Sequence, residues 1–151
     1  ILSKPMPRSS FLLAKFTALA LVFAIAVLVA GLSCYYYTYF LFGALDAIYW
    51  LALNGLVILY ILVFVAITLF FSTLTRTQYA AIGLSFGTLI LMGIIGSLPG
   101  ASTYVPDGLI INASGLMVGL PISNWISLWI SLGIIFASLF SACLIFQKQE
   151  L

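Results

Sequence analysis

The side chains that could carry acid–base, metal or nucleophilic chemistry are few in this chain of 151 residues. It contains no histidine, two cysteines and three acidic residues, Asp46, Asp107 and Glu150. A metal site needs several donors that converge on one point, and a nucleophilic serine needs a base to activate it. The sequence offers neither arrangement. We therefore predict no catalytic residue, no metal site and no cofactor bound to this chain, and no enzymatic activity of its own.

The sequence also lacks the common nucleotide-binding motif. No Gly-x-x-x-x-Gly-Lys-Ser/Thr loop is present to hold nucleotide phosphates. If the protein takes part in energy-driven transport, ATP must therefore be bound and hydrolysed by another polypeptide.

A few polar side chains lie inside long uncharged stretches and could line a path through a membrane. We consider four of them candidate pathway residues: Asn54, Thr68, Ser85 and Thr88. Each could equally make a hydrogen bond between helices, a contact worth about 0.6 kcal/mol on average in membrane proteins. The sequence leaves both roles open.

The segment before the first long apolar run is basic and contains a proline. Lys4, Arg8 and Lys15 supply the charge, and Pro5 and Phe11 lie between them. Such a segment could dock on a partner protein. It could also simply be the set of cations that orients any membrane protein and binds anionic headgroups.

The charged residues divide the chain into four long stretches without any Asp, Glu, Lys, Arg or His. These stretches follow Lys15, Asp46, Arg76 and Asp107 and contain 30, 29, 30 and 40 residues. With 65% hydrophobic and 5% charged residues, the chain has too few polar side chains to coat a soluble fold. About 20 apolar helical residues cross a bilayer, so each stretch can hold one membrane span.

The predicted fold is all-α, a polytopic membrane protein with four transmembrane helices. Backbone groups in lipid must be paired within a helix or a closed barrel, and the alternating pattern of barrel strands is not seen. We place the spans near residues 13–34, 48–71, 79–98 and 123–146, in a single transmembrane domain, 1–151. Residues 1–12 precede the first span. Residues 99–122 contain prolines, glycines and short apolar runs, and we predict that they form a short re-entrant or interfacial external hairpin.

The basic residues predict the orientation in the membrane because they are retained on the cytoplasmic side. They lie before the first span, between the second and third, and after the fourth: Lys4, Arg8, Lys15, Arg76 and Lys148. Both termini are then cytoplasmic, and we expect a multi-pass protein of the plasma membrane. Cys34 and Cys143 fall near opposite ends of their spans, so we expect no disulfide between them. The sequon Asn112-Ala113-Ser114 lies in the external hairpin, and we do not expect it to be glycosylated.

The segment of residues 2–15, which we call the leader, resembles the cytoplasmic segment of type-2 ABC transporter permeases. In that family a Ser-Lys-Pro step, an Arg three residues after the Pro, an apolar pair and a Lys lead into a membrane helix. The matching residues are Leu2-Ser3-Lys4-Pro5-Met6-Pro7-Arg8-Ser9-Ser10-Phe11-Leu12-Leu13-Ala14-Lys15. The resemblance continues through the polar turn at 72–78, the external hairpin and the charged tail after the last span. Ala14 stands where the family often has Gly.

This resemblance implies a permease subunit of an ATP-driven ABC exporter, which forms the substrate path. Permease units of the family have six spans, so we expect the first two to be missing from this chain. The implied ATPase-coupling residues are Lys4, Pro5, Arg8, Phe11 and Lys15, with Arg8 paired to an acidic residue of the ATPase. The implied partners are an ABC ATPase subunit, which binds ATP, and a second permease unit in a homodimer or heterodimer. Both work within the lipid bilayer, and no nucleic acid is expected as a partner.

A second function is compatible with the same residues. The helices could belong to a non-transporting membrane scaffold or assembly subunit that binds a larger membrane complex laterally. Small residues spaced four apart, as in Gly83 and Gly87 or Ser127 and Ser131, let helices approach closely and would serve either function. A bound ATPase at the leader would favour transport, whereas partners bound only through the helix faces would favour a scaffold.

Overall fold

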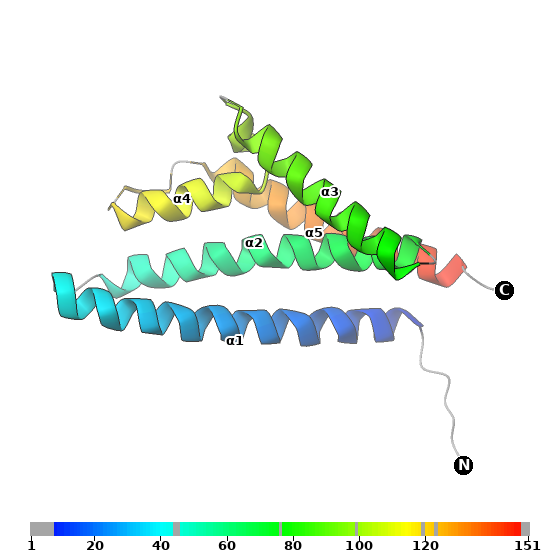
Figure 1. Ribbon diagram of the computed structural model, residues 1–151, viewed down its shortest axis with the longest axis horizontal. Helices are drawn as coiled ribbons and strands as arrows, with labels where there is room; N and C mark the ends of the chain where they lie inside the picture. The colour runs from blue at the N-terminus through cyan, green and yellow to red at the C-terminus, as the bar shows by residue number, and fades with distance from the viewer. Residues whose placement is uncertain are drawn as a thin grey trace, which may run out of the picture.

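The computed structural model describes residues 8–43, 46–75, 77–98, 100–118, 120–122 and 124–148, with side chains from residue 10 to residue 145 within these ranges. The described residues form five α-helices and one 3₁₀ helix, and no strand occurs among them. The elements are α1 (Arg8–Phe42), α2 (Ala47–Leu74), α3 (Gln78–Gly96), η1 (Ala101–Tyr104), α4 (Asp107–Met117) and α5 (Trp125–Lys148) (Figure 1). The prediction of an all-α fold is confirmed.

Four helices, α1, α2, α3 and α5, are long and apolar enough to cross a membrane. Helix α4 has 11 residues, or about 16 Å of helix, which is about half of the roughly 30 Å hydrocarbon core. Four helices that can serve as the expected spans are therefore present. The described part of the segment between α3 and α5 contains only the short elements η1 and α4.

The first helix is longer than the predicted span. It begins at Arg8 rather than Leu13 and continues to Phe42 rather than Cys34. No proline or glycine interrupts residues 32–42, so the aromatic run there continues the helix. Gly43, at a φ of 89°, then ends it, and its N–H donates to the Tyr39 carbonyl over 3.1 Å.

Helix α2 is the centre of the fold. It contacts α1, α3, α4 and α5, whereas α1 and α3 do not contact each other in the described part of the chain. Figure 1 shows α1 running along one side of α2, with α4 and α5 on the opposite side and α3 leaning away from it. Asp46 begins α2 as its N-cap, because its carboxylate accepts the Ile48 N–H over 3.1 Å.

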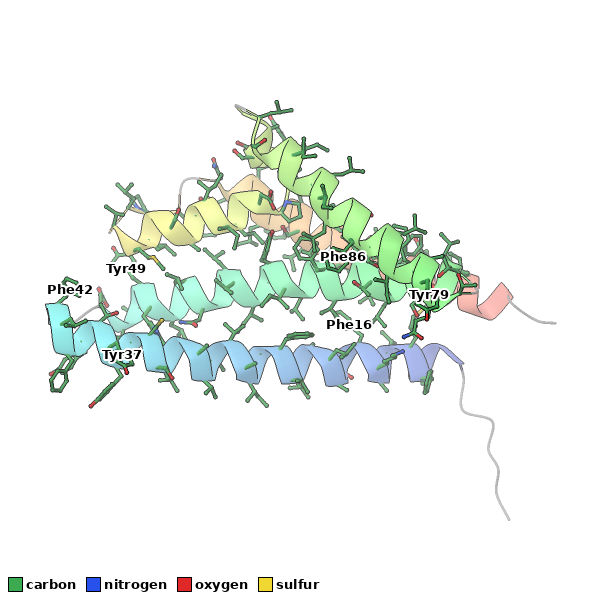
Figure 2. All side chains as sticks on the ribbon, viewed as in Figure 1. Phe16, Tyr37, Phe42, Tyr49, Tyr79 and Phe86 are labelled. Atoms are coloured by element: carbon green, nitrogen blue, oxygen red, sulfur yellow. The ribbon has the colours of Figure 1, made fainter. Side chains whose placement is uncertain are left out.

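Two buried clusters attach the other helices to α2. The first joins Leu56 of α2 to three residues of α4: Leu109, Ala113 and Leu116. The second joins α2 to Ile135 of α5 through Val63, Ala66 and Ile67. Phe16 of α1 packs against this second cluster (Figure 2). Most side chains of α1 and α3 remain exposed and apolar, as expected of helices whose surroundings are lipid.

Helix ends gather at the two ends of the bundle. The start of α1, the end of α2, the start of α3 and the end of α5 lie together at one end (Figure 1). The α1–α2 connection and the end of α4 lie at the other. Cys34 and Cys143 are both free, as predicted from their places near opposite ends of their helices.

Candidate functional site

The first two turns of α1 contain the part of the predicted coupling segment that the structure describes. Positions 8, 11 and 15 are three and four residues apart, so they share one face of the helix. Phe11 is 61% exposed and Lys15 is exposed, while Leu12 between them is buried. The helix thus buries one apolar side chain here and presents an aromatic ring and a cation outward.

The rest of the predicted coupling segment lies outside the description. Lys4 and Pro5 fall outside the described residues, and the side chain of Arg8 does too. Residues 8–12, which we had assigned to a segment before the first span, belong to α1. Pro7 does not prevent a helix from beginning at Arg8, because proline is tolerated at the start of a helix.

Three of the four candidate pathway residues make the same local hydrogen bond. The hydroxyls of Thr68, Ser85 and Thr88 each donate to the carbonyl four residues earlier in their own helix, over 2.8 Å. These bonds satisfy the hydroxyl protons and leave the oxygens able to accept further hydrogen bonds. Thr68 lies on α2, whereas Ser85 and Thr88 share one face of α3.

Asn54 is placed differently from the other three. It is 3% exposed, and its amide donates to the Trp50 carbonyl over 2.9 Å. A side chain at Gly31 of α1 would collide with the Asn54 amide, and the Trp50 indole donates to the Gly31 carbonyl over 3.2 Å. Asn54 therefore lies in a close contact between α1 and α2. It is about 21 Å along α2 from Thr68, so the four residues do not converge on one site within this chain.

The segment between α3 and α5 is held to α2 by a residue pair that our sequence reading missed. The Tyr60 hydroxyl, in the middle of α2, donates to the carboxylate of Asp107 at the start of α4 over 3.1 Å. The same carboxylate lies against Gly96, where any side chain would collide with it. Asp107, which falls within the predicted external hairpin, thus joins α2, α3 and α4 at one point.

A second polar contact closes the hairpin between α4 and α5. The Asn112 amide donates to the Asn124 carbonyl over 2.9 Å, and its oxygen accepts the Asn124 N–H over 3.3 Å. The amide nitrogen also lies 3.5 Å from the hydroxyl of Ser127, which is fully buried. Asn112 is itself 4% exposed. The asparagine of the sequon is therefore buried in this fold and holds the hairpin together.

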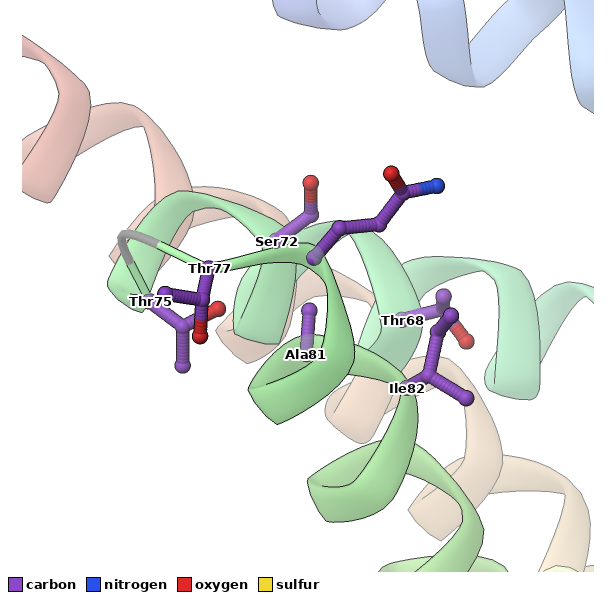
Figure 3. Close-up of a pocket in the computed structure, with 7 residues that line it drawn as sticks. Thr68, Ser72, Thr75, Thr77, Ala81 and Ile82 are labelled. Carbon is purple, nitrogen blue, oxygen red and sulfur yellow. The ribbon is translucent and has the colours of Figure 1, made fainter.

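The described residues line several hollows on the surface of the bundle, of which three bear on the site. One of about 480 Å³ lies near the α1–α2 connection, and aromatic side chains and Asn54 contribute to its lining: Tyr35, Tyr49, Trp50 and Asn54. The other two, of about 470 and 370 Å³, lie toward the opposite end of α2 and share Thr68 and Ser72. Figure 3 shows the smaller of these two, where α2 turns into α3. Within the described residues, no group of three or more His, Cys, Asp or Glu could hold a metal ion.

Taken together, these observations define a class of protein. Four apolar helices of membrane-spanning length, a short helical hairpin and a few satisfied polar contacts make this a multi-pass helical membrane protein.

The family follows from comparison with known proteins. The family model described as ABC-2 family transporter protein matches residues 1–105, which include the leader, α1, α2 and α3. The chain belongs to this family and is a membrane component of an ABC-2 family transporter. Comparisons with curated proteins and with solved structures gave no match. The resemblance recognised from the leader is confirmed.

Proposed function

We propose that this chain is the permease subunit of an ATP-driven ABC exporter, and that it couples to a separate ATPase subunit through its leader. The observation that carries this proposal is the family match, which starts at residue 1 and contains the whole leader. ATP binding and hydrolysis belong to the partner, and this chain supplies the path and the mechanical connection.

The coupling step follows from the geometry of α1. Arg8 and Phe11 would contact the ATPase together with Lys4 and Pro5, and Arg8 would pair with an acidic residue there. Lys15, two turns further into α1, would lie at the membrane surface beside this contact. Helix α1 is continuous from Arg8 to Phe42, so a displacement at its first turn moves the whole element. The Trp50 and Asn54 contacts at Gly31 then carry the displacement to α2.

The path itself would form between this chain and a second permease unit. Thr68, Ser85 and Thr88 can offer hydroxyl oxygens to a cargo without losing their own hydrogen bonds. Helix α3 buries only Ala81 among its described residues, which leaves most of its surface for a second unit or for cargo.

The orientation with both termini in the cytoplasm places the leader where an ATPase can reach it. The start of α1, the end of α2, the start of α3 and the end of α5 gather at one end of the bundle (Figure 1). All five basic residues are close in sequence to these helix ends: Lys4, Arg8 and Lys15 to the start of α1, Arg76 to the end of α2 and the start of α3, and Lys148 to the end of α5. Retention of positive charge on the cytoplasmic side supports this end as the inner one.

Charge reversal in the leader tests the coupling. We expect Arg8→Glu to weaken binding of the co-expressed ATPase by about thirtyfold and to lower ATP-dependent export from cells with it, because loss of an interfacial charge pair costs about 2 kcal/mol. The matched control is Lys148→Glu, which reverses a charge at the same end of the bundle but outside the leader. Membrane insertion should be unchanged in both.

Unchanged export and unchanged ATPase binding in Arg8→Glu, with Lys148→Glu equally silent, would contradict the proposed coupling. A protein that binds no ATPase and is retained by other membrane proteins through its helix faces would instead be a scaffold.

A further inference from the structure

The two hollows that share Thr68 and Ser72 adjoin each other along α2, and we refer to them together as the crevice. The apolar part, of about 470 Å³, is lined by α1, α2 and α3 through residues that include Leu19, Phe23, Phe64 and Leu89. The polar part, of about 370 Å³, continues from it toward the α2–α3 turn. Figure 3 shows this polar part, with Thr68 and Ser72 on α2 and Ile82 facing them from α3.

The crevice exists because α1 and α3 both pack on α2 but do not contact each other in the described part of the chain. Its floor is one face of α2, where the lining residues recur at helical spacing: Ile61, Val65, Thr68, Leu69 and Ser72. The opposing wall on α1 is a single stripe in which each residue lies four positions after the last: Lys15, Leu19 and Phe23.

The length of the crevice matches one leaflet of a bilayer. From Ile61 to Ser72 the floor is about 16 Å long. This is about half of the roughly 30 Å hydrocarbon core. An acyl chain that lies in the crevice would therefore extend from the bilayer midplane to the headgroup level of the leaflet at the Ser72 end.

The end of the crevice at Ser72 carries the groups that an anionic headgroup would need. Lys15 supplies the positive charge among the described lining residues, and a lysine stem can lie along apolar surface while its ammonium stays at the headgroups. Ser72, Thr77 and Gln78 also line this end. The Ser72 and Thr77 hydroxyls and the Gln78 amide can each donate a hydrogen bond.

We propose that this crevice binds an anionic phospholipid from the leaflet at the start of α1, with one acyl chain between α1 and α3 and the phosphate beside Lys15. This binding function goes beyond export and does not depend on it. The apolar part alone gains little selectivity, because surrounding lipid is equally apolar. Lys15 and the neighbouring donors supply the preference for negative charge.

The test compares lipids on the purified chain in detergent. Native mass spectrometry with added phosphatidylglycerol or phosphatidylcholine of the same acyl chains reports the fraction of protein with one retained lipid. We expect about fivefold tighter retention of phosphatidylglycerol, the factor that one lysine near a headgroup supplies. Inorganic phosphate alone should neither bind nor displace the lipid, because it lacks the chain that occupies the apolar part.

Two variants separate the headgroup from the tail. Lys15→Gln should remove the preference for phosphatidylglycerol, because it removes the charge and keeps most of the stem. Leu19→Trp should fill the apolar part and lower retention of both lipids by about tenfold. Its control is Leu21→Trp, on the same helix at a position that is 64% exposed and does not line the crevice, and this control should retain lipid as the parent does.

Equal retention of the two lipids by the parent, or the same preference in Lys15→Gln, would overturn the proposal. So would lipid retention in Leu19→Trp equal to that in Leu21→Trp, and so would displacement of the lipid by inorganic phosphate. Because the assay contains no ATPase, its failure would leave the proposed export function untouched, and a failure of export would leave the lipid site untouched.

Discussion

Asn112 has a buried amide side chain that pairs with the backbone of a residue 12 positions later. Its oxygen and its nitrogen bond the N–H and the carbonyl of the same residue, Asn124, just before α5 begins. A buried backbone group in a membrane protein is costly when it is unsatisfied, and the Asn112 side chain supplies the partners here. The sequon at Asn112 matches a glycosylation motif that we do not expect to be used, and the structure gives this residue a structural role.

We predict that Asn112→Asp destabilises the fold whereas Ser114→Ala does not, although both remove the sequon. The aspartate keeps the shape but lacks the donor to the Asn124 carbonyl, and an unsatisfied buried group costs about 1–3 kcal/mol. The Ser114 hydroxyl bonds only its own helix, at Ile111 over 2.8 Å, and is exposed. Thermal unfolding in detergent measures both, and equal stability of the two variants would show that the Asn112 pairing contributes nothing.

Gly31 is the second residue whose role depends on a close contact. A methyl group there would collide with the Asn54 amide, whereas one at Gly55 would meet nothing within 4 Å. We predict that Gly31→Ala costs about 1–3 kcal/mol through overpacking. Gly55→Ala should be neutral or should stabilise α2, because alanine favours a helix over glycine by up to about 1 kcal/mol. Unfolding in detergent measures the difference.

Asn54→Ala provides the check on this explanation. In that background Gly31→Ala should cost clearly less, because the amide that it strikes is gone. An unchanged cost would mean that the contact between α1 and α2 at Gly31 does not set the stability of the pair.

At the scale of elements, the attachment of α4 to α2 rests on one apolar cluster and one charged hydrogen bond. We predict that Tyr60→Phe weakens this attachment by about 1.5–3 kcal/mol, the range for a hydrogen bond to a charged group. Hydrogen exchange of the α4 amides should speed up accordingly while that of α5 stays near the parent value. Tyr104→Phe is the control because Tyr104, in η1, is 65% exposed, and it should leave exchange in α4 unchanged.

The long elements were predictable from sequence because their signal is local. A charge near each end and an uninterrupted apolar run are enough to place a span, and α2, α3 and α5 lie within a few residues of the predicted ranges. The far end of α1 was misjudged because aromatic residues suit both an interfacial loop and a helix that continues past the membrane core. Gly43, rather than the tyrosines, ends it.

The contacts that hold the hairpin were not predictable because their partners are distant in sequence and carry no pattern. Tyr60 and Asp107 are 47 residues apart, and neither an isolated tyrosine nor an aspartate after a proline indicates the other. The lipid-sized crevice shares this property. It arises from how α1 and α3 diverge across α2, which no residue type determines alone.

At the scale of the whole molecule, the orientation decides whether the leader can reach an ATPase. The two ends of α2 provide matched probes. Ala47 begins α2 beside the α1–α2 connection, and Thr77 follows its other end; both are exposed. In a parent in which Cys34 and Cys143 are replaced by alanine, single cysteines at these positions report the side of the membrane on which each end lies.

We predict that in intact cells a membrane-impermeant maleimide labels Ala47→Cys and spares Thr77→Cys until the membrane is opened. The reason is that Thr77 follows Arg76 in the sequence and directly precedes α3, whose start shares its end of the bundle with the start of α1 (Figure 1). Positive charge is held on the cytoplasmic side. The reverse pattern would place the leader outside the cell, where no ATP-driven subunit could dock. The proposed coupling would then fail, while the lipid crevice would remain and would draw on the outer leaflet instead.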